Sequence, residues 1–196
     1  MKSQLRLFVA VEIAPQVRSK ITRYLNSHVT DLKRIRWVAP DQFHMTLKFL
    51  GDVPQTEIHH VIRALKNACM RSEPFDLVFE DVGAFPNAEC PRTLWVGVSE
   101  GIEESSDLAE AIDEELAGIG YPRESRRFTP HLTVGRVKKS VPGDCSTGLD
   151  AFLLPAKGPL FFGVSSVTSV TLFSSELCRG GPKYEPLAEI DLKSAD

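Results

Sequence analysis

Cysteine is scarce in this chain of 196 residues, and its four copies lie far apart. No two of them form a Cys-x-x-Cys pair, and no cluster of cysteine, histidine and acidic residues has the spacing of a metal site. We therefore expect neither a metal nor another cofactor. We also expect the four thiols to be reduced and mostly buried, because the chain shows no secretion signal.

Long apolar runs are absent as well. The apolar stretch that starts at Leu5 is broken by Glu12, so it is too short for the core of a signal peptide or for a membrane span. Hydrophobic residues make up 42% and charged residues 25% of the chain, which is typical of a soluble globular protein. We expect a cytoplasmic monomer with no membrane contact and no obligate protein partner.

An excess of positive charge is also missing, because the formal net charge is −3. A global basic field that attracts nucleic acid is thus excluded. Basic residues nevertheless gather locally at 33–36, 123–127 and 136–139, whereas acidic residues concentrate between 100 and 115. Such local patches can bind phosphate groups, although a solvated surface is the more ordinary interpretation of any one of them.

Helical and extended patterns alternate along the chain. Apolar spacing predicts helices from Pro15, over 58–69 and over about 106–116. Strands are predicted at 5–11, late in 37–50, and at 75–85, 93–98 and 128–137. One or two more are predicted at 160–172 and a last one at 184–192, and most of 138–158 is predicted to be a loop. No linker divides the chain. We therefore predict one α+β domain over 1–196, with two lobes that each hold an antiparallel or mixed sheet.

One short pattern occurs twice. Residues 43–49 read Phe-His-Met-Thr-Leu-Lys-Phe, and residues 130–136 read Pro-His-Leu-Thr-Val-Gly-Arg. Alternate residues of a strand share a face, so each copy presents an imidazole beside a hydroxyl, with apolar residues behind them. A lone histidine on a strand is usually structural. Two copies suggest two related halves that bring the histidines together.

Two opposed histidines suit the cleavage of a phosphodiester. One imidazole takes a proton from the attacking oxygen, and the other gives a proton to the leaving oxygen. Each role typically contributes ~10²–10⁴-fold to the rate near pH 7. The hydroxyls of Thr46 and Thr133 can donate hydrogen bonds to the negative oxygens of the transition state.

The paired motifs resemble the two His-x-Thr-x motifs of the 2H phosphoesterase superfamily. The flanking sequences resemble its branch of bacterial and archaeal RNA 2′,3′-cyclic phosphodiesterases, first named 2′-5′ RNA ligases. These flanks are Arg6-Leu-Phe-Val-Ala, Trp37-Val-Ala-Pro, Phe49-Leu-Gly, Leu94-Trp-Val-Gly-Val, Phe128-Thr-Pro and residues 172–184. The likeness spans nearly the whole chain, and the spaced pair of motifs is specific in a way that neither motif is alone.

The resemblance implies two lobes related by a pseudo-two-fold axis, with flanking helices and both motifs in a central groove. It implies hydrolysis of a 2′,3′-cyclic phosphate, at an RNA end or on a nucleoside, to a 2′-phosphate without a metal. By the same resemblance, His44 is the acid that protonates the leaving 3′ oxygen and His131 is the base that activates water. Thr46 and Thr133 hold the phosphate.

Two basic residues beside the motifs are further candidates for substrate binding. Lys48 shares the face of His44 by alternation, where it either contacts the RNA backbone or is solvated. Arg136 follows His131 by five residues, so alternation places it on the opposite face unless a bulge brings it back. Its position in the family suggests a phosphate contact, for which a guanidinium is suited. For Tyr184, the rim of the groove and the core are equally plausible.

Two other functions remain open at this point. One is a reversible 2′-5′ RNA ligase, which uses the same site in the reverse direction. The other is a module that binds RNA ends without catalysis. Turnover of a cyclic-phosphate dinucleotide in excess chelator distinguishes the phosphodiesterase from the binding module, and added RNA with a 5′-hydroxyl end tests ligation.

Overall fold

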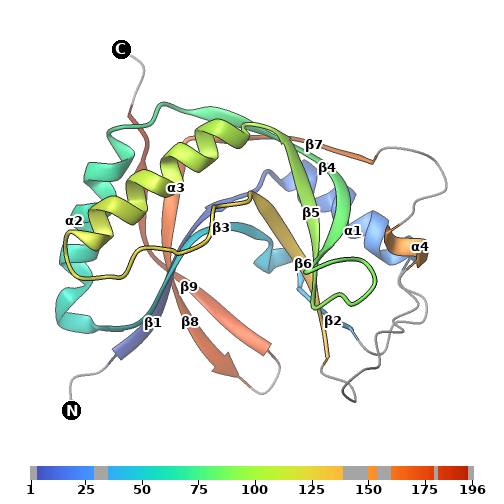
Figure 1. The fold of residues 1–196 in the computed structure, drawn as a ribbon, viewed down its shortest axis with the longest axis horizontal. Coiled ribbons are helices and arrows are strands. Elements are labelled where there is room, and N and C mark those ends of the chain that lie inside the picture. Colours follow the sequence, from blue (N-terminus) through green and yellow to red (C-terminus); the bar gives the residue numbers. More distant parts are fainter. Residues whose placement is uncertain (1–3, 29–34, 139–149, 154–159, 179–180, 194–196) are drawn as a thin grey trace.

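The computed structural model describes residues 4–28, 35–138, 150–153, 160–178 and 181–193, which contain two antiparallel sheets (Figure 1). The first sheet has the strand order β3-β1-β8-β9. Its strands are β1 (Gln4–Glu12), β3 (His44–Pro54), β8 (Ser169–Cys178) and β9 (Gly181–Asp191). Because β1 pairs with both β3 and β8, this lobe is built from the two ends of the chain.

The second sheet has the strand order β2-β6-β5-β4-β7 and comes mainly from the middle of the chain. Its strands are β2 (Ile35–Trp37), β4 (Phe75–Phe85), β5 (Thr93–Glu100), β6 (His131–Val137) and β7 (Phe161–Val167). All neighbouring strands in both sheets run antiparallel. The two lobes are therefore interleaved along the chain.

Each sheet has its own helices. In the first lobe α2 and α3 lie side by side against the sheet, whereas α1 contacts β7 and α4 contacts β4 in the second lobe (Figure 1). The helices are α1 (Pro15–His28), α2 (Ile58–Cys69), α3 (Ile102–Ala117) and α4 (Asp150–Leu153), with 3-10 turns η1 (Pro40–Gln42) and η2 (Gln55–Glu57). No helix among the described residues is long and apolar enough to cross a membrane.

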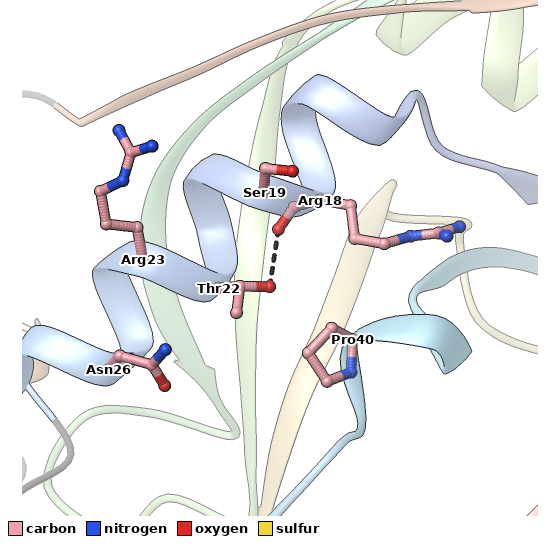
Figure 2. A pocket seen from close by; sticks show the side chains of 6 residues that line it. All are labelled: Arg18, Ser19, Thr22, Arg23, Asn26 and Pro40. Atoms are coloured by element: carbon pink, nitrogen blue, oxygen red, sulfur yellow. Dashed lines mark hydrogen bonds between the residues drawn. The ribbon is translucent and has the colours of Figure 1, made fainter.

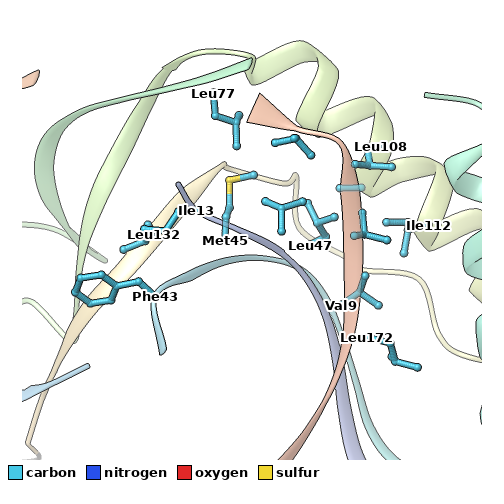
Figure 3. Packing of buried hydrophobic residues seen from close by; sticks show 14 of the residues in the cluster. Val9, Ile13, Phe43, Met45, Leu47, Leu77, Leu108, Ile112, Leu132 and Leu172 are labelled. Carbon is cyan, nitrogen blue, oxygen red and sulfur yellow. The ribbon is translucent and has the colours of Figure 1, made fainter. Parts of the chain in front are cut away.

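One continuous apolar core contacts both motif strands (Figure 3). Met45 and Leu47 from β3 lie in it together with Leu132 from β6 and Ile112 from α3. These residues are the apolar members of the two motifs and part of the predicted apolar face of α3. Full burial of such a side chain is typically worth ~1.5–3 kcal/mol, so the core anchors each motif strand from behind.

The predicted α+β fold with a sheet in each of two lobes is confirmed, and so are the longer helices and strands. The helix α3 begins at Ile102 rather than near 106, because Gly101 adopts a left-handed conformation with φ of 81° just before it. Prediction missed β2 and α4, since three or four residues carry no recognisable period. The strand β8 continues to Cys178, beyond the predicted end at 172, and β9 begins at Gly181, before the predicted start at 184.

The expectation that all cysteines are reduced is wrong for Cys90, which takes part in a disulfide. Cys69 and Cys178 are free, the first buried and the second exposed. Burial raises the pKa of the Cys69 thiol to about 12, and the charge of Asp191 adds to the effect, so this thiol is inert. Wide spacing in sequence gives no signal for a disulfide that only the fold brings together.

Candidate active site

The two motif strands belong to different sheets and contact each other directly. His44 is the first residue of β3, and His131 is the first residue of β6. Each strand leaves its histidine and threonine half-buried on one side and buries the intervening apolar residue on the other. We call the side with the histidine and threonine the motif face. The fold thus brings together the two elements that the duplicated pattern predicted to meet.

Both imidazole rings are held by the same kind of hydrogen bond. Nδ1 of His44 lies 2.7 Å from the carbonyl oxygen of Gln42, and Nδ1 of His131 lies 2.7 Å from that of Thr129. A carbonyl oxygen can only accept, so Nδ1 carries the hydrogen in each ring. The carbonyl two residues before each histidine therefore fixes the tautomer and leaves Nε2 to exchange protons.

An aromatic ring also packs against each imidazole. The ring centroid of Phe8 is 5.0 Å from that of His44, and the centroid of Phe85 is 5.0 Å from that of His131. Tyr184 meets the edge of His44 at 5.2 Å, which places it beside the candidate site rather than in the main core. Sequence reasoning missed Phe8 and Phe85, because they lie on other strands and only the fold brings them to the histidines. Phe8 is on β1, which pairs with β3, and Phe85 is on β4, which β5 separates from β6.

The electrostatics of the two histidines are similar. Burial lowers the pKa of both His44 and His131, their bonds to the carbonyl oxygens oppose this shift, and the positive charge of Arg136 lowers both pKa values further. The same charge lowers the pKa of Tyr184, although burial raises it overall. One guanidinium thus acts on both imidazoles and on the phenol.

A β-bulge interrupts each motif strand at the same place. In β3 the extra residue is Leu47, since the residues on either side of it pair with consecutive residues of β1. In β6 the extra residue is Val134, by the same criterion against β5. A bulge shifts the alternation of side chains by one, so the residues that follow it exchange faces. In both strands two buried residues therefore follow the threonine, and an exposed residue comes next.

Arg136 is that exposed residue in the second copy. The bulge at Val134 returns Arg136 to the face of His131 and Thr133. Simple alternation without a bulge would have placed it on the opposite face. Its charge reaches both histidines, as the pKa shifts show. A phosphate contact by Arg136 stays a prediction.

The prediction that Lys48 shares the face of His44 is wrong. The bulge turns Lys48 to the core side of β3, where the residue is only 3% exposed. Its ammonium group donates hydrogen bonds to the carboxylate of Asp113 and, at 2.8 Å, to the carbonyl oxygen of Pro122. Lys48 therefore has no access to a substrate on the motif face.

Asp113 connects Lys48 to the segment that leads into the second motif. Its carboxylate accepts a hydrogen bond from the backbone N–H of Glu124 at 3.1 Å and one from Nε of Arg123 at 3.3 Å. Burial alone would raise the pKa of Asp113, but the hydrogen bonds from Lys48, Glu124 and Arg123 and the charge of Lys48 lower it overall. This cluster ties β3 to α3 and to residues 122–124, which precede β6.

Metal ligands do not gather in the described part of the chain, where no three His, Cys, Asp or Glu side chains could hold an ion together. Among the described residues, no carboxylate pairs with either motif histidine. Each already uses Nδ1 for a backbone carbonyl and has a single nitrogen left. This donor set fits proton transfer better than a metal centre.

A two-lobed α+β fold with a His-x-Thr strand from each lobe at their contact defines a phosphoesterase with two histidines. A family model described as LigT like Phosphoesterase matches residues 11–95 and again residues 96–184. The chain therefore belongs to the LigT-like phosphoesterase family, which confirms the resemblance of its motifs. Each matched range contains one motif, so the duplication extends to the two halves of the chain.

Relatives of known name cover nearly the whole chain. It is 33% identical to an RNA 2′,3′-cyclic phosphodiesterase of Aquifex aeolicus, over 92% of this chain and 90% of the relative. It is 34% identical to an enzyme of the same name from Archaeoglobus fulgidus, over 93% and 98%. Among solved structures, TT0787 of Thermus thermophilus superposes with a TM-score of 0.76 at 28% identity, over 98% of this chain and 100% of the other.

Proposed function

We propose that this protein hydrolyses a 2′,3′-cyclic phosphate, at an RNA end or on a nucleoside, to a 2′-phosphate without a metal. The observation that carries the proposal is the pair of imidazoles on adjoining strands, each held at Nδ1 by the carbonyl oxygen two residues upstream. The names of the relatives support the same substrate class.

In the proposed reaction each histidine works through Nε2. His131 starts neutral and takes a proton from a water molecule as the water oxygen attacks phosphorus. His44 starts protonated and gives its Nε2 proton to the 3′ oxygen as the bond between phosphorus and that oxygen breaks. The product carries a 2′-phosphate and a 3′-hydroxyl. Exchange with solvent then returns both rings to their starting states.

Charge on the phosphate oxygens grows as the water attacks. Thr46 and Thr133 share the motif face with the histidines, so their hydroxyls can donate to these oxygens. Arg136 adds a positive charge that already acts on both rings. A guanidinium that faces the phosphate also favours the binding of the anionic substrate.

The test is hydrolysis of a short oligoribonucleotide that ends in a 2′,3′-cyclic phosphate, in excess chelator, with the product identified by ³¹P NMR. A 2′-phosphate end is expected. His44→Ala and His131→Ala should each abolish turnover, whereas His60→Ala is the matched control, because His60 is exposed on α2. A 3′-phosphate product, or equal losses in all three variants, would contradict the proposed roles.

A further inference from the structure

Basic side chains outside the motifs occur on α1 and on β2. On α1, Arg18 and Arg23 line a surface hollow, but their guanidinium groups point to opposite sides (Figure 2). Val17 and Ile21 of the same helix lie in the main apolar core, so α1 packs on the core side of the second sheet. The two arginines of α1 therefore share no anion site and lie away from the motif face.

The strand β2 instead places a basic residue on the motif face. Arg36 pairs directly with Arg136 in the antiparallel register of β2 and β6, and directly opposed residues share a face of a sheet. Ile35 and Trp37, on either side of Arg36, face the other way and pack in the main core. Arg36 itself is exposed, and it belongs to the first basic cluster of the sequence. Two guanidinium groups thus extend from adjoining strands on the motif face.

A row of cross-strand partners connects Arg36 to the candidate active site. Phe85 of β4 pairs with Thr93 of β5. Thr93 pairs with Arg136 of β6, which pairs in turn with Arg36 of β2. At one end of the row, the ring of Phe85 packs against His131 with 5.0 Å between the centroids. The row therefore begins at a motif histidine, and Arg36 forms its outer end.

The charges of Arg36 and Arg136 are not compensated by the described residues. Neither arginine forms an ion pair in this part of the chain, and the other members of the row are a threonine and a phenylalanine. Like charges that lie directly opposite each other on a sheet repel. A bound anion would relieve this repulsion, and the fork of a guanidinium matches the oxygens of a phosphate group.

An RNA end offers two phosphates in sequence, which are the cyclic phosphate and the backbone phosphate that joins the last two nucleotides. Under the proposed function, the cyclic phosphate lies at the histidines and Arg136 faces it. Arg36 starts one strand farther out, about 4.8 Å beyond Arg136, and its long side chain extends this reach. The two arginines are thus placed to contact consecutive phosphates of one RNA strand.

We infer that Arg36 binds the backbone phosphate that joins the last two nucleotides of the RNA. The inference rests on the proposed function, since it takes a cyclic-phosphate end as the substrate at the histidines. It makes β2 part of the RNA-binding surface. It also implies that a phosphate on the 5′ oxygen of the terminal nucleoside improves the substrate.

Two substrates that differ by this one phosphate test the inference. They are 2′,3′-cyclic AMP and the same nucleotide with a further phosphate on its 5′ oxygen. We expect the wild type to prefer the 5′-phosphorylated substrate by about tenfold in kcat/KM, because hydrogen bonds between charged groups are among the strong ones. Arg36→Gln should remove this preference, mainly through KM, since Arg36 does not touch the reacting atoms. Arg36→Lys keeps the charge without the fork and should retain part of the preference.

Arg63→Gln is the matched control, because Arg63 is exposed on α2 in the other lobe and the variant loses the same charge. It should keep the preference of the wild type. A wild type without any preference, an unchanged preference in Arg36→Gln or an equal loss in Arg63→Gln overturns the inference.

The proposed function can fail separately, if the wild type hydrolyses neither substrate. Calorimetric titration with 2′-AMP and with adenosine 2′,5′-bisphosphate then decides the role of Arg36 on affinity alone. Tighter binding of the bisphosphate by the wild type, lost in Arg36→Gln but kept in Arg63→Gln, is the expected result. Equal affinities of the wild type for the two ligands, or an undiminished difference in Arg36→Gln, overturn the inference.

Discussion

Replacement of Lys48 by methionine tests the buried cluster behind the first motif. Methionine has nearly the same length and no charge, so the variant fills the space but leaves the carboxylate of Asp113 without its ammonium partner. Lys48 is 3% exposed, and the side chain of Asp113 is 14% exposed. Removal of one member of a buried ion pair typically costs ~3–5 kcal/mol.

The lower end of that range applies here. Asp113 keeps its hydrogen bonds from Arg123 and from the N–H of Glu124 after the change. We therefore expect a loss of about 3 kcal/mol in the free energy of unfolding. For a chain of this size, each kcal/mol shifts Tm by roughly 2–4 °C, so Tm should fall by about 6–12 °C.

Urea unfolding and thermal unfolding measure the effect, and two variants control it. The double change Lys48→Met with Asp113→Leu removes both charges and should regain most of the loss. Arg71→Met breaks the exposed ion pair between Arg71 and Glu114, which spans 3.0 Å, and should change stability little. A Lys48→Met protein as stable as Arg71→Met would refute the argument that this buried pair matters.

The advantage of the wild type over the double variant should depend on pH. The pKa of Asp113 is lowered in the fold, so its charge adds stability above the unfolded value of 3.8, and this stability is lost as the pH falls through the lower folded pKa. The two proteins should thus converge in stability in strong acid. A gap that widens as the pH falls would contradict the cause given for the shift.

Three further predictions concern the candidate active site. Single changes of His44 or His131 to alanine should remove nearly all turnover, and Thr46→Ala or Thr133→Ala should cost about 10²–10³-fold or less, as steady-state rates will show. Excess chelator should leave turnover intact, and activity that zinc or manganese alone restores would contradict this. The profile of kcat/KM against pH should be bell-shaped and lie on the acid side of neutrality, because burial and then Arg136 lower the pKa of both histidines. Arg136→Met should move both limbs of this pH profile to higher pH, and NMR titration of the two histidine rings can check the shift. Movement of only one limb would contradict an effect of Arg136 on both histidines.

The alternation of side chains in the sequence correctly predicted the residues of each motif that come before the bulge. His44, Thr46, His131 and Thr133 share faces as the period of two requires, and the apolar residues between them are buried. The fold class followed from the same patterns, because long periodic segments were present in both halves. The contact between the two motif strands was suggested by their duplication and by the resemblance to the 2H phosphoesterases.

Prediction failed where the period of two is broken. No residue type near Leu47 indicates a bulge. Alternation therefore placed Lys48 on the wrong face of its strand and could not decide the face of Arg136. Glycine often marks such a place, yet Gly135 occurs only in the second copy. The partner of Lys48 was equally out of reach, since Asp113 is 65 residues away in the chain.

The two bulges also show how a duplicated site becomes unequal. After the bulge, Lys48 in the first copy stands where Gly135 stands in the second. There a side chain would come within 3.0 Å of Ile35 and 3.1 Å of Trp37, so the second copy has no room for a buried lysine. On the motif face, Phe49 of the first copy corresponds to Arg136 of the second, a 57% exposed ring against a positive charge. The two histidines have the same tautomer, and the charge of Arg136 lowers the pKa of both. A division into acid and base must therefore come from what differs around them, such as Tyr184, which packs against His44, and the exchange of Phe49 for Arg136 on the motif face.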